Sequence, residues 1–208
     1  MDPWEHIEAD RLAFADYLDT LAPADWEAPS LCEGWTVKGV AAHLLVSPTM
    51  SKGQIFLKFL GSGFNLDKMS AKLVTQMTAD MSTDEMIAAT RSSAGVRSAP
   101  PGLKPVGVLA EVLTHTADIS LAIDKPFELP VDHYVLALDH LKGVQPVLGC
   151  KQRIDGLKLQ ATDTDWSTGA GLLVEGDAKH LLVAMTGRSA ALEALRGDGV
   201  DTLRTRCA

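Results

Sequence analysis

One polar strip in an otherwise apolar stretch carries residue types that bind metal ions. Glu111 and His115 are four residues apart, so on a helix they lie one turn apart on the same face. Asp118, three residues further on, continues that face. A Glu and a His at this spacing are common on solvent-exposed helices, so the pair alone does not indicate a metal site.

A third residue, His43, makes a metal site the better interpretation. It stands in the apolar run of residues 40–45, where a histidine bonded to a carbonyl or carboxylate inside the core is the ordinary interpretation. Together with Glu111 and His115 it completes a set of two histidines and one carboxylate, which helical bundles assemble from facing helices. Zinc favours these ligands and keeps a fourth position open, although Fe(II) and Ni(II) accept the same set.

The remaining histidines and cysteines offer weaker candidates. His133 and His140 are seven residues apart, with no carboxylate at a suitable spacing. Cys32, Cys150 and Cys207 are odd in number and widely spaced, which favours reduced thiols over disulfides or a cysteine-rich zinc site. We expect Cys32 to behave as a small apolar residue rather than as a nucleophile.

Composition limits the classes of partner. The chain has 208 residues, of which 46% are hydrophobic and 22% charged, so it can bury a core without disulfides or structural zinc. A formal charge of −8 makes nucleic acid and anionic membranes poor partners and favours a small molecule. No secretory signal and no long apolar run is present, so we expect a cytoplasmic protein; the oligomeric state stays open.

Helices are predicted throughout residues 1–148. A capping box at residues 2–5 opens the first helix, and Thr36 caps a second, which Pro48 kinks before it resumes toward residue 60. Further helices are expected around residues 69–77, after the capping box at 82–85, over 106–123 and over 132–147. Long amphipathic segments with short connections predict a four-helix bundle with an added helix.

The pattern changes after residue 148. Residues 158–163 and 172–175 read as strands, followed by helices at about 178–185 and 190–196. We therefore predict an α+β fold in two domains, a helical bundle of residues 1–148 and a small α/β domain of residues 149–208.

Several motifs stand out along the chain: WEAPSLCEGWTV at 26–37, AHL at 42–44, EVLTHTAD at 111–118, and four C-terminal segments at 165–166, 173–176, 181–188 and 197–200. Together they resemble the mycothiol-dependent maleylpyruvate isomerase family, within the DinB-like superfamily. We found no matching motif in residues 51–105.

The resemblance implies a zinc-binding DinB-like four-helix bundle with a C-terminal α/β domain. His43, Glu111 and His115 become the zinc ligands, and mycothiol or another low-molecular-weight thiol becomes the cosubstrate. The zinc would stabilise the thiolate, and Arg188 would hold a carboxylate of a small electrophilic substrate. Asp118 would orient a ligand histidine, although a surface salt bridge is an equal alternative. Ala117 replaces a tryptophan common in the family, which bears on the substrate pocket.

Three activities and one non-catalytic role stay open at this point. The thiol adds to a cis double bond and is eliminated after rotation in an isomerase, whereas an S-transferase keeps the adduct. A metal-dependent hydrolase would use Asp118 as general base toward a zinc-activated water. A non-catalytic metal-binding or regulatory module would keep only the bundle.

Overall fold

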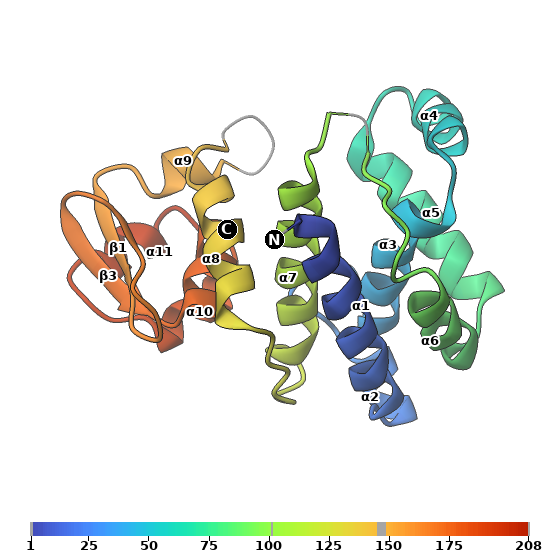
Figure 1. The fold of residues 1–208 in the computed structure, drawn as a ribbon, viewed down its shortest axis with the longest axis horizontal. Helices are drawn as coiled ribbons and strands as arrows, with labels where there is room; N and C mark the ends of the chain where they lie inside the picture. Colours follow the sequence, from blue (N-terminus) through green and yellow to red (C-terminus); the bar gives the residue numbers. More distant parts are fainter. Residues whose placement is uncertain (1, 101, 145–148, 208) are drawn as a thin grey trace. The chain divides into compact units, whose positions relative to one another are not determined.

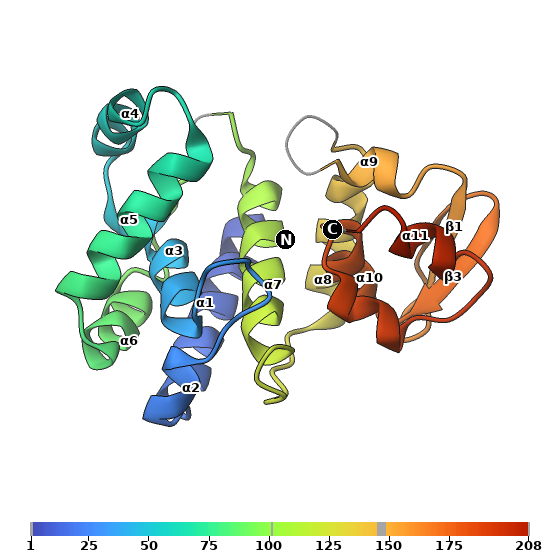
Figure 2. The same cartoon turned by 180° about the vertical axis from the view of Figure 1, so that it is seen from behind.

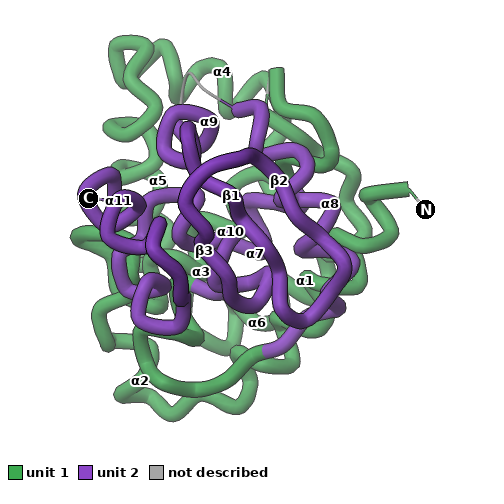
Figure 3. The backbone as a smooth tube through the Cα atoms, turned by 90° about the vertical axis from the view of Figure 1, so that its left-hand side faces the viewer, with its two compact units in different colours: residues 1–108, 118–127 green, residues 109–117, 128–208 purple. Residues whose placement is uncertain are grey.

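Helices form most of the chain in the computed structural model, which describes residues 2–100, 102–144 and 149–207 (Figure 1). The chain divides into two compact units, coloured in Figure 3. Unit 1 comprises Met1–Val108 and Asp118–Phe127, and unit 2 comprises Leu109–Ala117 and Glu128–Ala208. The predicted domain boundary between residues 148 and 149 stays a prediction, and residues 145–148 lie outside the described part of the chain.

Unit 1 is helical. Its helices are α1 (Pro3–Asp19), α2 (Pro23–Glu27), α3 (Val37–Thr49), α4 (Lys52–Gly61), α5 (Leu66–Asp80) and α6 (Thr83–Ser92), and α7 (Pro105–Ser120) runs through both units. Helix α1 packs on α6, and α3 packs on both α5 and α6. Among the described residues, no helix is long and apolar enough to span a lipid bilayer.

The helix starts follow the capping signals of the sequence. Asp2 accepts a hydrogen bond from the Trp4 amide, and the Thr36 side chain accepts one from the Gly39 amide. Ser82 forms the predicted capping box. Pro48 does not kink one long helix; α3 ends at Thr49, and Ser51 caps a separate helix, α4. Helix resumes toward residue 60 as predicted, but as a separate element, because the Ser51 side chain caps its start.

The core of unit 1 fixes α3 and the end of α7. Val40, Ala41 and Leu45 of α3 are almost fully buried in one cluster with Phe14 of α1 and Ile119 of α7. Close-packed interiors leave little freedom for such residues. The backbone that carries His43 is therefore held rigidly.

Unit 2 combines helices with a small sheet. It contains α8 (Val131–Leu141), α9 (Cys150–Arg153), β1 (Leu157–Ala161), β2 (Ser167–Gly169), β3 (Leu172–Gly176), α10 (Ala178–Met185), the 3-10 helix η1 (Ser189–Ala194) and α11 (Val200–Arg204). Helix α10 packs on α8 and contacts β1 and β3 (Figures 1 and 2). The segment predicted as a last α-helix is η1, and the short elements α9, β2 and α11 were not predicted.

The sheet has the order β2-β1-β3, with β1 antiparallel to β2 and parallel to β3. Leu157 and Leu159 of β1 are buried, in the alternation typical of a strand with one covered face. Gly169 has a φ of +76°, and a Cβ there would lie 2.1 Å from the Leu157 carbonyl oxygen. Only glycine fits this turn. The predicted α+β fold class is confirmed.

Candidate metal centre

Helix α7 presents Glu111 and His115 on one face, one turn apart. Both side chains are half-buried, whereas Val112 and Leu113 between them are buried. The first two residues of the predicted polar strip thus lie along a partly accessible edge of an otherwise buried helix. A carboxylate and an imidazole at such an edge can meet an ion without full burial.

Helix α3 presents His43, which is half-buried although Ala41 and Ala42 beside it are fully buried. The Trp35 ring lies against the imidazole, with centroids 5.1 Å apart and planes inclined by 45°. The indole limits the orientations open to the imidazole. Trp35 belongs to the motif at 26–37, but its contact with His43 had no separate signal in the sequence.

The potential ligand atoms of His43, Glu111 and His115 lie within 4.8 Å of one another. Two ligands of a tetrahedral zinc ion are about 3.4 Å apart when each bond is about 2.1 Å. The three residues are therefore close enough to one another to be candidate ligands of one ion. Two further groups of metal-binding residue types meet the same limit among the described residues, Cys32 with His115 and Asp118, and His6 with Asp132 and His133.

Asp118 lies at the end of the polar strip and is fully buried. Its Oδ2 accepts a hydrogen bond from Cys32 Sγ at 3.0 Å, and its carbonyl oxygen accepts one from the Leu31 amide at 3.1 Å. Burial excludes the surface salt bridge that we had weighed for this residue. Cys32 is half-buried and polar in its contacts, so treating it as a small apolar residue was incomplete. The two residues are 86 positions apart, and no local pattern could have joined them.

Arg188 lies in unit 2, directly after α10 and Gly187, and is half-buried. One guanidinium nitrogen donates to the Thr186 carbonyl oxygen at 3.1 Å. This hydrogen bond ties the side chain to its own turn. A role for Arg188 in substrate binding stays a prediction.

The other two cysteines are held as neutral thiols. Burial raises the pKa of Cys150, although Arg153 partly opposes this effect. Burial also raises the pKa of Cys207, again against the opposing charge of Arg153. A thiolate is the reactive form of a cysteine, so neither thiol has the environment of a nucleophile.

Comparisons with known proteins bear on the resemblance noted above. Residues 7–97 match the family model of the mycothiol maleylpyruvate isomerase N-terminal domain. The match includes residues 51–97, where we had found no motif. No curated protein matches the chain.

Two solved structures have a similar fold. The crystal structure of the mycothiol-dependent maleylpyruvate isomerase is 13% identical, with a TM-score of 0.61 over 95% of this chain and 92% of that chain. A histidine-to-alanine mutant of that enzyme is 11% identical, with a TM-score of 0.59 over the same shares. The resemblance seen in the sequence is confirmed: residues 7–97 match the model of the mycothiol maleylpyruvate isomerase N-terminal domain, and the chain has the fold of the mycothiol-dependent maleylpyruvate isomerase.

Proposed function

We propose that this protein is a cytoplasmic, zinc-dependent enzyme that uses mycothiol, or another low-molecular-weight thiol, to act on a small electrophile. The reaction is an isomerisation or an S-transfer. The observation that carries the proposal is the approach of His43, Glu111 and His115. The family match over residues 7–97 and the fold similarity support it. Other divalent metals accept the same ligand set.

His43, Glu111 and His115 would hold the metal through two imidazole nitrogens and one carboxylate oxygen. When bound, zinc would supply the positive charge that lowers the pKa of a thiol, as it does for water. Three protein ligands keep a position open for the sulfur. Glu111 offsets one unit of the metal charge and limits its attraction for other anions.

Asp118 is proposed to orient His115, three residues before it on α7. The Cys32 thiol and the Leu31 amide fix Asp118 from the loop before α3. Carboxylates commonly set the orientation of ligand histidines in this way, and removing them weakens metal binding about 10- to 100-fold. The loop at 28–36 would thereby support the metal centre without contacting the ion.

Arg188 is proposed to bind a carboxylate of the substrate. A guanidinium donates two parallel hydrogen bonds to a carboxylate, which fixes both the position and the plane of the substrate. The thiol supplies the nucleophile: addition to a cis double bond, rotation and elimination give the trans isomer, and retention of the adduct gives a conjugate.

A panel of substrates tests the proposal. Zinc-loaded protein is mixed with maleylpyruvate and with several other electrophiles, with and without mycothiol, and products are identified by NMR and mass spectrometry. We expect turnover that requires the thiol. Product of the same mass as the substrate indicates isomerisation, and product heavier by one thiol indicates S-transfer.

Two outcomes would contradict the proposal. Equal turnover with and without a thiol would favour a hydrolase in which Asp118 acts as general base. Protein that takes up no metal on titration and has no activity would favour a non-catalytic binding module. A glutathione arm shows whether any thiol suffices or mycothiol is recognised.

A further inference from the structure

Unit 1 exposes a cluster of large apolar side chains around α4. Ten large hydrophobic residues are exposed among those described, and five of them lie within residues 56–66. These five, Phe56 (53% exposed), Leu57 (67%), Leu60 (39%), Phe64 (66%) and Leu66 (52%), are called the α4 patch below. In Figures 1 and 2, α4 and the start of α5 stand at the end of unit 1 opposite α2. Exposed apolar clusters of this kind commonly mark interaction sites.

Helix α4 is apolar on its outer face as well as on its inner one. Ile55 is buried in a cluster with Met69 and Leu73 of α5, while Phe56 and Leu57 point to solvent. A surface helix normally has a polar outer face, and a helix apolar all round is normally covered. The outer face of α4 therefore has the composition of a contact surface.

Phe64 strengthens this interpretation through its backbone. Its φ is +60°, in the left-handed region that disfavours bulky side chains, and it directly follows Gly63 with a φ of +64°. The ring packs edge-on against Phe59, with centroids 5.4 Å apart, and still exposes two thirds of its surface. The chain thus holds an aromatic ring at the surface in a costly conformation, which is characteristic of functional positions.

The segment that carries the patch is positively charged. Residues 52–72 contain Lys52, Lys58, Lys68 and Lys72 against Asp67 alone, a formal charge of +3 in a chain whose total is −8. Three of these lysines, at 52, 68 and 72, are exposed. The net charge led us to expect no anionic membrane partner, but charges more than about 10 Å apart are largely screened at physiological salt. The local charge governs what approaches the patch.

We propose that the α4 patch binds the surface of an anionic lipid bilayer. Phe56, Leu57 and Phe64 insert among the headgroups, and the lysines interact with the lipid phosphates, as in amphipathic helices that lie in the membrane interface. A symmetric dimer through the same patch is less favourable because the lysines of both copies would face one another. The proposal is independent of the metal centre.

Vesicle sedimentation with the full chain tests the proposal. We expect binding to vesicles that contain phosphatidylglycerol to exceed binding to pure phosphatidylcholine by at least about tenfold, and to weaken as salt is raised. Equal binding to both vesicle types, or none, would overturn the proposal. Sedimentation velocity without lipid tests the alternative, a dimer. If the protein binds no vesicles but forms a concentration-dependent dimer, and the apolar variant below abolishes that dimer, the patch binds a second copy of the chain.

Two triple variants with matched controls locate the binding surface. One replaces Phe56, Leu57 and Phe64 by serine, and its control replaces the exposed Leu12, Leu136 and Leu172 by serine. The other replaces Lys52, Lys68 and Lys72 by glutamine, and its control does so at the exposed Lys104, Lys151 and Lys158.

Each patch variant is expected to lose binding, and each control to keep it. The loss of three lysines should weaken binding about a hundredfold, since each contributes about a factor of five at an anionic surface. Circular dichroism checks that all four proteins are folded. Controls that weaken binding as much as the patch variants would overturn the assignment to α4.

Discussion

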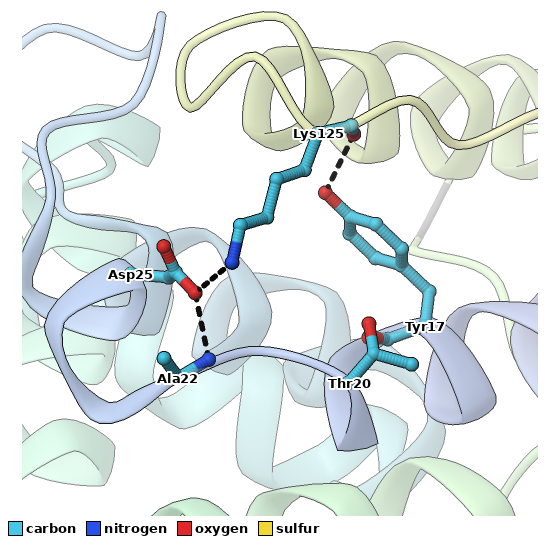
Figure 4. A network of polar contacts seen from close by, with 5 residues as sticks. All are labelled: Tyr17, Thr20, Ala22, Asp25 and Lys125. Atoms are coloured by element: carbon cyan, nitrogen blue, oxygen red, sulfur yellow. Dashed lines mark hydrogen bonds and ion pairs between the residues drawn. The ribbon is translucent and has the colours of Figure 1, made fainter.

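Two polar clusters in the molecule join residues from distant segments, and they differ in what they contain. In the network of Figure 4, Lys125 Nζ contacts Asp25 Oδ2 at 2.5 Å, and the same oxygen accepts the Ala22 amide at 2.6 Å. The Tyr17 hydroxyl donates to the Lys125 carbonyl oxygen at 3.0 Å. This network includes its own cation. The candidate metal centre instead combines two imidazoles and a carboxylate.

This difference in composition distinguishes the structural network of Tyr17, Asp25 and Lys125 from the candidate metal centre. Hydrogen bonding to Lys125 holds the pKa of Asp25 below its ordinary value, so the carboxylate is charged and paired within the protein. Burial, with a smaller contribution from Asp25, raises the pKa of Tyr17 to about 12, so its hydroxyl stays a donor. In this network, each of these hydrogen-bond donors faces an acceptor within the protein. His43, Glu111 and His115 all offer lone pairs, the arrangement that metal ions take up.

Removal of one proposed metal ligand should have the largest effect on the candidate metal centre. His43→Ala should lower bound zinc from about one ion per chain to almost none, and should abolish thiol-dependent turnover, because two ligands on one helix hold zinc weakly. Metal content by mass spectrometry and competition with a chelator measure the loss. His180→Ala, at another half-buried helical histidine, is the matched control and should keep its zinc. Unchanged metal content in His43→Ala would make the ligand assignment wrong.

Arg188, the proposed substrate-binding residue, should give the next largest effect. Arg188→Ala should raise KM for a carboxylate substrate about 10- to 100-fold, because hydrogen bonds to charged groups contribute about 1.5–3 kcal/mol. Arg188→Lys should recover part of the loss, and metal content should stay unchanged. Arg204→Ala, which removes an exposed ion pair with Glu193, is the control. Equal steady-state constants for Arg188→Ala and the unsubstituted protein would remove Arg188 from the site.

A substitution in the network of Tyr17, Asp25 and Lys125 should have a smaller effect, on the free energy of unfolding, and this effect depends on pH. Tyr17→Phe removes the hydrogen bond to the Lys125 carbonyl oxygen and should lower the free energy of unfolding by about 1 kcal/mol near neutral pH. The folded-state pKa of Tyr17 is raised, so this residue stabilises the fold below the unfolded pKa of 10.0 and loses that effect as pH rises toward about 12. Urea unfolding should show the difference between the two proteins shrinking above pH 10. A difference that is constant with pH would contradict the raised pKa.

The sequence carries a clearer signal for the candidate ligands than for their surroundings. Glu111 and His115 are one helical turn apart, so their spacing is a local property, and the Thr36 cap fixes the helix that carries His43. The Cys32 contact to Asp118 joins residues 86 positions apart. The network of Tyr17, Asp25 and Lys125 likewise could not be predicted from the sequence, because packing rather than periodicity brings these residues together.

The fold shows the same division between local and long-range signals. Capping residues predicted where α1, α3 and α6 begin, since a cap acts on the backbone within three residues. Strand β2 was missed because its three residues are too short for an alternation, and only pairing with β1 defines them. The break between α3 and α4 depends on Ser51, whose capping competes with continuation of the helix.

The smallest expected effect is on kcat in variants of the chain's own cysteines, Cys150 and Cys207. If the nucleophile arrives with the cosubstrate, the thiols of Cys150 and Cys207 are dispensable for chemistry. Cys207→Ser should then keep kcat with mycothiol within about twofold. Burial raises the pKa of both Cys150 and Cys207, so each is a neutral thiol near pH 7. Cys150→Ala should cost stability, because the side chain is fully buried, but should also keep kcat in folded protein. Steady-state rates at saturating mycothiol test both variants. A large fall in kcat for either variant, with zinc still bound, would show that the protein supplies a nucleophile of its own.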